Sequence, residues 1–315
     1  MTEMLKLFLF FLLLLCPALD AHAEQDTPDI CKEFVQNDDQ AGGPAGSRAS
    51  IPHGTGLLWK IEGSDGRQSH LFGTIHSQDR LVTNLPPPVR LALAQSRQLV
   101  MEIVPDSKAN QAFSASIYFT DGATLDSLID KEIYHALVQK LPSYGIDAEH
   151  ARHLKPWAAF TLIGRPRPVR AATQDEVLMR AATDTGQRIA GLESMEELVS
   201  TLDGIPRSDQ ITILYDTVCN HERILHNTRD LVKLYVARDL AGMVNFNEQP
   251  HQDEAVFGRY MQRIVYDRNR RMVTRMEKYL REGGAFVTIG ALHLPGAKGV
   301  LRLLEEKGYR IVLVY

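Results

Sequence analysis

The sequence predicts an α/β protein with α+β character, in which a mixed central sheet is built from N- and C-terminal strands around a large helical middle section. Short apolar runs typical of buried strands occur before residue 104 and after residue 284, whereas most of the sequence between them has helical patterns. Neither end supplies enough strands for a stable sheet of its own, so strands from the two ends must pair.

The N-terminal strands form a hairpin. Residues 57–61 (LLWKI) are bulky and apolar, residues 63–67 make a turn, and residues 69–75 return as the partner strand. Pro86-Pro87-Pro88 then opens a helix over residues 89–95, because proline is tolerated in a first helical turn. The N-terminal part therefore supplies an antiparallel pair of strands followed by a short helix.

The remaining elements follow from the same signals. Helices dominate from residue 110 to about residue 186, with breaks at glycines and prolines. The other expected elements are strands at 98–103, 188–192, 286–289 and 310–314, and helical regions at 209–246, 268–281 and 298–307. Parallel pairing through helical crossovers is expected for the strands at 98–103 and 286–289.

The first residues have the pattern of an export signal. Lys6 precedes an apolar run over residues 7–15, and Ala21-His22-Ala23 has the small residues that signal peptidase recognises. The run is shorter than the roughly 20 residues of a membrane span, so we expect a signal peptide at 1–23 and no stable membrane span after its cleavage. The protein is therefore expected to be exported, either periplasmic or secreted.

The residues after the signal separate into a leader and one domain. Residues 24–55 are polar and rich in glycine and proline, which indicates a flexible leader before a domain at 56–315. Two cysteines remain after cleavage, Cys31 and Cys219. In an oxidising compartment they suggest one disulfide, and two unrelated buried thiols are the alternative. The formal net charge of −4 implies no general attraction to nucleic acid, and the oligomeric state is left open.

Two short segments near opposite ends of the chain share the pattern of an apolar run followed by Gly-x-x-His. They are residues 70–76 (HLFGTIH) and residues 286–293 (FVTIGALH). In α/β folds, ligands gather at the carboxyl ends of strands, and a glycine there lets the backbone approach a neighbour closely. The chain has only 11 histidines, so the repetition favours one shared site that contains His76 and His293.

A glutamate after the third strand is the best candidate to join the two histidines. Glu102 follows buried apolar residues, where a carboxylate is costly unless it is paired or binds a cation; a plain salt bridge is the alternative. Glu193 ends a similar run and is a candidate partner or general base, or else a charge at a helix start. Two histidines and one glutamate with an open position form a hydrolytic metal set.

Other catalytic patterns are missing from the sequence or have the wrong spacing. His221 and His226 are five residues apart, which places their rings about 140° apart around a helix, so they do not share one ion. The sequence contains no Gly-x-Ser-x-Gly nucleophile elbow and no Gly-x-x-x-x-Gly-Lys phosphate loop. The strand-end residues are therefore the main candidates for chemistry.

A known family has both Gly-x-x-His motifs within similar flanks. The matching segments are 57–61 (LLWKI), 71–76 (LFGTIH), 85–86 (LP), 99–102 (LVME), 154–157 (LKPW), 191–193 (GLE), 267–269 (DRN) and 289–296 (IGALHLPG). By these segments the chain resembles the TraB/GumN family, which is related to the TIKI metalloproteases and more distantly to erythromycin esterase-like and ChaN-like proteins. The resemblance runs from about residue 57 to the end.

The resemblance implies a site with a divalent metal. Three residues carry over as metal ligands or catalytic residues, namely His76, Glu102 and His293. Arg268 and Asn269 carry over more loosely, as groups that hold a substrate carbonyl or carboxylate, and Arg268 is the expected stabiliser of an oxyanion. Glu193 is expected to support the catalytic group. Histidine and carboxylate ligands suit Mn, Co or Zn alike, so the identity of the metal is left open.

The function expected from these residues is that of an exported metal-dependent hydrolase, a peptidase or amidase that acts on a peptide or another amide. The alternative is a non-catalytic protein that uses the same histidines to bind haem or a metal. A haem protein would show a Soret band, whereas a colourless protein with a tightly bound transition metal would favour hydrolysis.

Overall fold

The computed structural model describes residues 29–33, 51–104, 107–167, 169, 171–247 and 253–315. The signal peptide expected at 1–23 and most of the expected leader lie outside these residues. No helix in the described ranges is long and apolar enough to cross a membrane.

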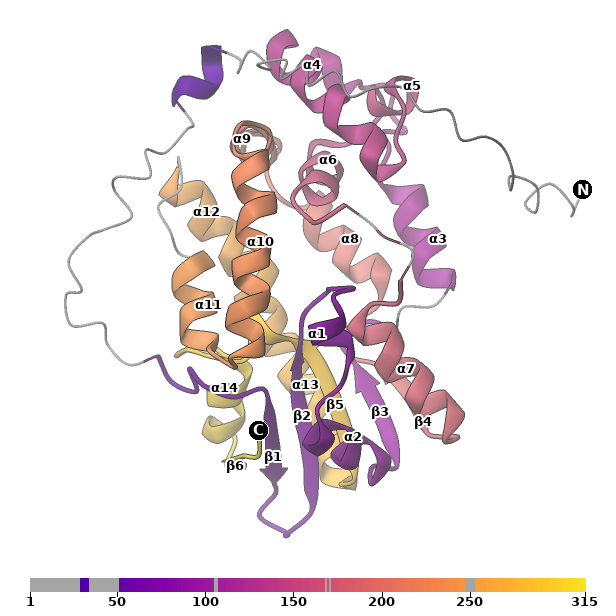
Figure 1. Ribbon diagram of the computed structural model, residues 1–315, viewed down its shortest axis with the longest axis vertical. Coiled ribbons are helices and arrows are strands. Elements are labelled where there is room, and N and C mark those ends of the chain that lie inside the picture. The colour runs from indigo at the N-terminus through magenta and orange to yellow at the C-terminus, as the bar shows by residue number, and fades with distance from the viewer. Residues whose placement is uncertain (1–28, 34–50, 105–106, 168, 170, 248–252) are drawn as a thin grey trace, which may run out of the picture.

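A six-stranded mixed sheet forms the centre of the fold, in the order β4-β3-β5-β2-β1-β6 (Figure 1). Its strands are β1 (Leu58–Glu62), β2 (Gln68–Thr74), β3 (Gln98–Met101), β4 (Arg188–Gly191), β5 (Ala285–Gly290) and β6 (Arg310–Leu313). β1 pairs antiparallel with β2 and β6, whereas β2, β5, β3 and β4 are parallel to one another. The C-terminal strand β5 lies between β2 and β3, which confirms that both ends of the chain build the sheet.

Helices connect the strands and form the middle section. They are α1 (Arg80–Thr83), α2 (Pro87–Ala94), α3 (Ser107–Ser116), α4 (Lys131–Lys140), α5 (Ala148–Ala151), α6 (Pro156–Ile163), α7 (Gln174–Asp184), α8 (Met195–Asp203), α9 (Arg207–Cys219), α10 (His221–Val236), α11 (Leu240–Asn247), α12 (Glu254–Met261), α13 (Asp267–Glu282) and α14 (Val300–Glu306). The expected helical region at 209–246 is divided into α9, α10 and α11, because Asn220 and Arg238 leave helical geometry, Arg238 with a φ of 62°.

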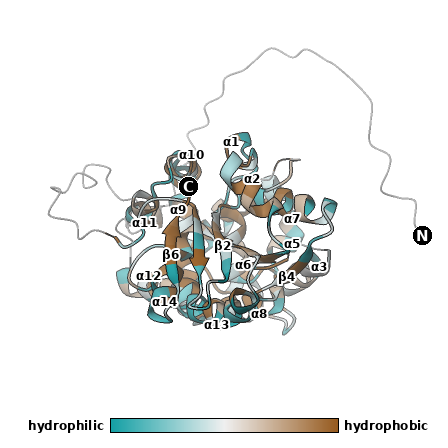
Figure 2. Cartoon of the chain, turned by 90° about the horizontal axis from the view of Figure 1, so that it is seen from below, coloured by the Kyte–Doolittle hydropathy of each residue, from teal (hydrophilic) through white to brown (hydrophobic). Residues whose placement is uncertain are grey.

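Helices cover both faces of the sheet. Seen from below, α2 and α7 lie on one face, and α13 and α14 lie on the other (Figure 2). The side chains between these layers form one apolar cluster, which includes Trp59, Phe72 and Phe286. Because burying each large apolar side chain stabilises a fold by about 1.5–3 kcal/mol, this packing holds the strand ends in fixed relative positions.

A second apolar cluster lies in the helical middle section, which stands above the carboxyl ends of the parallel strands in Figure 1. Cys31 belongs to this cluster and forms a disulfide with Cys219 at the end of α9, with their Cα atoms 5.2 Å apart. Residues 29–33 fall in the segment expected to be a flexible leader. They form a short 3-10 helix, η1 (Asp29–Glu33), because the disulfide and the burial of Cys31 attach them to α9.

Candidate active site

The loops after the four parallel strands meet at one rim of the sheet. The residues that follow β2, β3, β4 and β5 there are His76, Glu102, Glu193 and His293, respectively. The register places Thr74 opposite Gly290 and Met101 opposite Thr288, so neighbouring strands end at nearly the same level. Residues from distant parts of the sequence therefore share one edge, as the carboxyl ends of parallel strands do.

The two Gly-x-x-His motifs pack directly against each other at Gly73, the glycine of the first motif. A Cβ atom at Gly73 would lie 2.6 Å from Leu294 Cδ1 and 3.2 Å from Ala291 Cα, so a side chain at this position would separate the motifs. A Cβ atom at Gly290 would lie 3.3 Å from His293 Cδ2. The first glycine thus permits close packing between strands, and the second leaves room for the histidine of its own motif.

Glu102 is a carboxylate near the centre of the rim, with 15% of its side chain exposed. Its Oε2 accepts a hydrogen bond from the Gly290 N–H at 2.8 Å, and its Oε1 accepts one from Arg268. Burial alone would raise its pKa, but the electrostatic influence of His293 and Arg268, together with the Gly290 N–H, lowers the pKa to about 2. Glu102 is therefore ionised at neutral pH.

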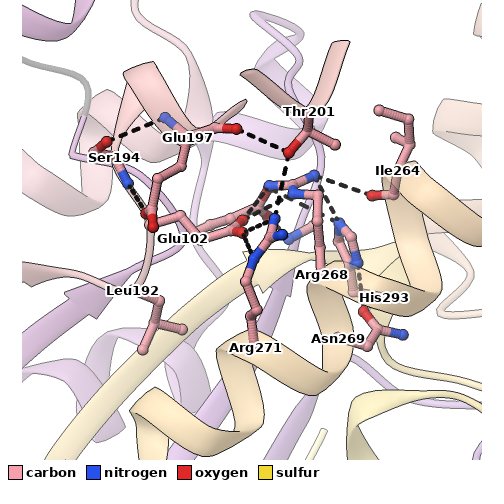
Figure 3. A network of polar contacts seen from close by, with 12 residues as sticks. Glu102, Leu192, Ser194, Glu197, Thr201, Ile264, Arg268, Asn269, Arg271 and His293 are labelled. Carbon is pink, nitrogen blue, oxygen red and sulfur yellow. Dashed lines mark hydrogen bonds and ion pairs between the residues drawn. The ribbon is translucent and has the colours of Figure 1, made fainter. Parts of the chain in front are cut away.

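Arg268 is the central cation of the rim, as Figure 3 shows. Its guanidinium donates to Glu102, and its Nε donates to Glu193 Oε2 at 2.8 Å. Arg271 donates to the other oxygen, Glu193 Oε1, at 2.8 Å. The Glu193 side chain has no exposed surface, so both of its oxygens are used inside the protein. Glu193 therefore positions Arg268, and this geometry does not fit the general-base role considered for it.

A π-helix precedes Arg268. This element, η5 (Gln262–Tyr266), joins α12 to α13, so that residues 254–282 form one continuous helix with a wide turn. Within the wide turn, the Ile264 carbonyl accepts a hydrogen bond from Arg268 Nη1 at 3.3 Å. π-turns are rare and occur frequently at functional sites. The sequence predicts only the helix that follows, because no local pattern marks the extra residue of a π-turn.

His293 is buried and is held by an amide. Its Nδ1 lies 2.6 Å from Asn269 Oδ1, and Asn269 Nδ2 donates to the Lys298 carbonyl at 2.9 Å. The second bond fixes the orientation of the amide, so the hydrogen-bond network assigns the proton to His293 Nδ1. Nε2 then offers its lone pair to the rim, 3.5 Å from Arg268 Nη1 and 3.8 Å from Glu102 Oε1. Burial lowers the pKa of His293, which favours the neutral ring.

His76 has a different environment, since 76% of its side chain is exposed. Its Nδ1 lies 2.9 Å from Asp175 Oδ2, and Thr74 Oγ1 donates to the other Asp175 oxygen at 3.1 Å. The hydrogen bond to Asp175 is the main cause that raises the pKa of His76 to about 9. His76 interacts electrostatically with Glu102 and Arg268, but no hydrogen bond joins it to either in the described part of the chain.

The structure changes the roles expected for some of these residues. Asn269 has no exposed surface, and both ends of its amide are bonded within the protein, so in this structure its amide orients His293. Sequence reasoning missed Asp175 and Arg271. A capping box formed by Thr173 and Glu176 marks the start of α7, but it gives no indication that Asp175 bonds a histidine 99 residues away.

The donor atoms at the rim are of the types that divalent transition metals bind, namely imidazole nitrogens and a carboxylate. Among the residues that the structure describes, no three His, Cys, Asp or Glu side chains are grouped closely enough to hold an ion. Arg268 binds Glu102 Oε1, the carboxylate oxygen that lies 3.8 Å from His293 Nε2, so this oxygen is already occupied by a cationic side chain. The donor chemistry fits a metal, and the arginine lies among the donors.

Curated proteins with similar sequences are metalloproteases by name. Metalloprotease TIKI2 of Danio rerio is 23% identical over 298 residues, which cover 77% of this chain and 58% of the relative. Metalloprotease TIKI2 of Xenopus tropicalis is 22% identical, and the alignment covers 81% of this chain and 59% of the relative. A metalloprotease TIKI homolog of Amphimedon queenslandica is 23% identical, with 81% and 60% covered. This chain thus spans about three fifths of the length of these relatives.

No solved structure matches the chain significantly. The model of the TraB/PrgY/gumN family matches residues 57–312. This range includes every residue of the rim and the whole sheet apart from Leu313, the last residue of β6. The chain belongs to the TraB/PrgY/gumN family.

Proposed function

We propose that this chain is an exported, metal-dependent hydrolase that cleaves a peptide or another amide bond. The observation that carries the proposal is the rim itself, where His76, Glu102, His293 and Arg268 meet from three strand ends and one helix. The relatives named metalloproteases support the same chemistry. These relatives are longer than this chain and distant in sequence, so the peptide or amide substrate that their names suggest is part of the proposal.

Three residues would hold the metal, a divalent transition metal such as Mn, Co or Zn: His76, Glu102 and His293. When bound, such an ion supplies Lewis-acid activation of water and of a carbonyl group. His293 meets the requirement for a ligand, because Asn269 holds its Nδ1 proton and leaves the Nε2 lone pair available. If Glu102 binds a metal ion in place of Arg268, Arg268 keeps Glu193 as its partner. No buried charge is then left unpaired.

Arg268 is proposed to stabilise the oxyanion that develops when an amide carbonyl is attacked. Burial lowers its pKa, but Glu102 and Glu193 raise the pKa above its usual value, so the guanidinium stays charged. Glu193 accepts a hydrogen bond from Arg268 and is itself held by Arg271, so the position of the Arg268 guanidinium is fixed. A charged donor that is buried and already in place is the arrangement that contributes most to this kind of catalysis.

Export is proposed from the sequence of residues 1–23 and from the disulfide between Cys31 and Cys219. Disulfides persist in oxidising compartments and are rare in a reducing cytoplasm. The expected result is a mature chain that begins after Ala23 and is recovered outside the cytoplasm. The mass of the protein purified from a periplasmic fraction or from the medium would test this expectation.

The decisive experiment measures metal content and hydrolysis together. The mature protein is reconstituted with Mn, Co or Zn, its metal is quantified per chain, and it is screened for cleavage of a peptide library. The test variant is the double substitution His76→Ala/His293→Ala. The matched control is His135→Ala/His226→Ala, which removes two exposed histidines outside the rim.

The proposal predicts about one metal ion per chain and peptide cleavage, both lost in the test variant and kept in the control. Glu102→Gln is expected to abolish cleavage as well. Unchanged metal content in the test variant would refute the assignment of these ligands. A Soret band on haem titration that depends on His76 or His293, without any hydrolysis, would instead establish the binding-protein alternative.

A further inference from the structure

We propose that Asp175 is a positioning residue that keeps a proton on His76 Nδ1, so that Nε2 is the ring nitrogen that gives up its proton and binds a cation at the rim. Asn269 does the same for His293, and the two Gly-x-x-His motifs thus use different acceptors for one purpose. The inference deepens the proposed function, since a metal ligand needs a free nitrogen, but the assignment of the tautomer does not depend on it.

The first support is the placement of the Asp175 carboxylate. Its Oδ2 lies 2.9 Å from His76 Nδ1, and its Oδ1 accepts a hydrogen bond from Thr74 Oγ1 at 3.1 Å. An ionised carboxylate only accepts hydrogen bonds, so His76 Nδ1 must carry the proton. Only 14% of the Asp175 side chain is exposed, although the ring it binds is open to solvent.

The second support is the fixed geometry around this carboxylate. Asp175 lies in the first turn of α7, which begins with a capping box between Thr173 and Glu176. The neighbouring Gln174 accepts a hydrogen bond from the Ile75 N–H at 3.1 Å, directly before His76. The start of α7 therefore binds the backbone and the side chain of the first motif at the same time.

A surface pair elsewhere in the chain shows what an ordinary contact looks like. His150 Nδ1 lies 2.8 Å from Asp147 Oδ1, three residues away on α5, and more than half of each side chain is exposed. That pair is local and its carboxylate is open to water. Asp175 is instead mostly buried and lies on α7, 99 residues after His76 in the sequence. Its carboxylate is also held by Thr74 at the end of β2. This difference is the reason to assign Asp175 a role at the site.

The test reads the tautomer directly, in the metal-free protein. A free neutral histidine prefers the Nε2–H form, so an Nδ1–H form requires an acceptor. Long-range proton–nitrogen NMR correlations, recorded at about pH 10 where histidine is neutral, are expected to show Nδ1–H for His76. In Asp175→Ala, His76 is expected to revert to Nε2–H, whereas Asp147→Ala leaves it unchanged.

Zinc affinity, measured by calorimetry at neutral pH, is the second readout. Loss of such an orienting partner typically lowers metal affinity about 10–100-fold, so Asp175→Ala is expected to bind zinc that much more weakly than Asp147→Ala. An Nε2–H form of His76 in the wild type would overturn the proposal, and this result does not require a stable variant. An unchanged tautomer in a folded Asp175→Ala variant would also overturn it. A wild type that binds none of Mn, Co or Zn but shows Nδ1–H would refute the proposed metal function and leave the role of Asp175 supported.

Discussion

The two Gly-x-x-His motifs have the same sequence pattern and lie on adjacent parallel strands, yet their histidines have opposite surroundings. His76 stands in solvent with a carboxylate partner, and its pKa is raised to about 9. His293 is buried with an amide partner, and its pKa is lowered. The comparison shows that a local motif determines where a side chain is delivered, whereas partners from distant segments determine its charge and accessibility.

The same contrast applies to the groups behind each histidine. Around His293, the charges are buried and interlocked, since Arg268 bridges Glu102 and Glu193. Around His76, one carboxylate faces an exposed ring. Substitutions near His293 should therefore affect folding stability, whereas substitutions near His76 should affect the site and leave stability nearly unchanged.

The largest effect is expected from Arg268→Leu. This change leaves the buried carboxylates of Glu102 and Glu193 without their shared partner, which costs about 3–5 kcal/mol of unfolding free energy. Urea unfolding at pH 7 measures it. The control is Arg270→Leu, on the same helix but 59% exposed, with an expected change within about 0.5 kcal/mol. Equal stability of the two variants would contradict the buried network.

Removing each histidine tests the comparison itself. His293→Ala is expected to cost about 2–4 kcal/mol, because it leaves a cavity and a buried Asn269 oxygen without its donor. His76→Ala is expected to cost less than about 1 kcal/mol, since an exposed ion pair contributes little. Both values come from denaturant unfolding of the metal-free protein. If the two variants lost similar stability, the two environments would not differ as described.

The glycines of the two motifs should also respond differently. Gly73→Ala is expected to cost about 1–3 kcal/mol, because its Cβ would lie 2.6 Å from a buried Leu294 methyl. Gly290→Ala should cost less than about 1 kcal/mol but displace the His293 ring, which lies 3.3 Å from the new Cβ. Unfolding measures the first effect, and the ring NMR shifts of His293 measure the second. Unmoved His293 signals in Gly290→Ala would show that the glycine is not needed for the ring.

The smallest effect concerns pH, and its sign differs between the histidines of the metal-free protein. The raised pKa of His76 contributes stability that is present below its ordinary value near 6.5 and is lost as pH rises through about 9. The lowered pKa of His293 contributes stability that is present above 6.5 and is lost as pH falls below it.

Stability curves of wild type, His76→Ala and His293→Ala against pH would reveal these opposite slopes. Solvent screening limits the His76 effect to less than about 1 kcal/mol. The difference between wild type and His76→Ala should shrink above pH 9, and the difference for His293→Ala should shrink in acid. Parallel curves for the two variants would mean that the two rings share one environment.

Much of the fold follows from contiguous residues. Alternating and continuous apolar runs predicted the strands within one or two residues at most ends, and the shortage of strands at either end required them to pair. The strand order was not predictable, because the insertion of β5 between β2 and β3 depends on contacts between residues about 190–220 positions apart. The π-turn before Arg268 was also missed, since no local pattern encodes it.

The sequence by itself determined that two histidines and a glutamate follow apolar strands, because strand ends and glycines are local signals. Only the tertiary structure decided which groups those residues meet. Asp175 reaches His76 across 99 residues, and Arg268 reaches Glu102 across 166. Such partners are selected by packing, which places side chains within hydrogen-bond distance whatever their separation along the chain. These partners, together with burial, then shift the pKa values of His76 and Glu102, and both influences exist only in the folded molecule.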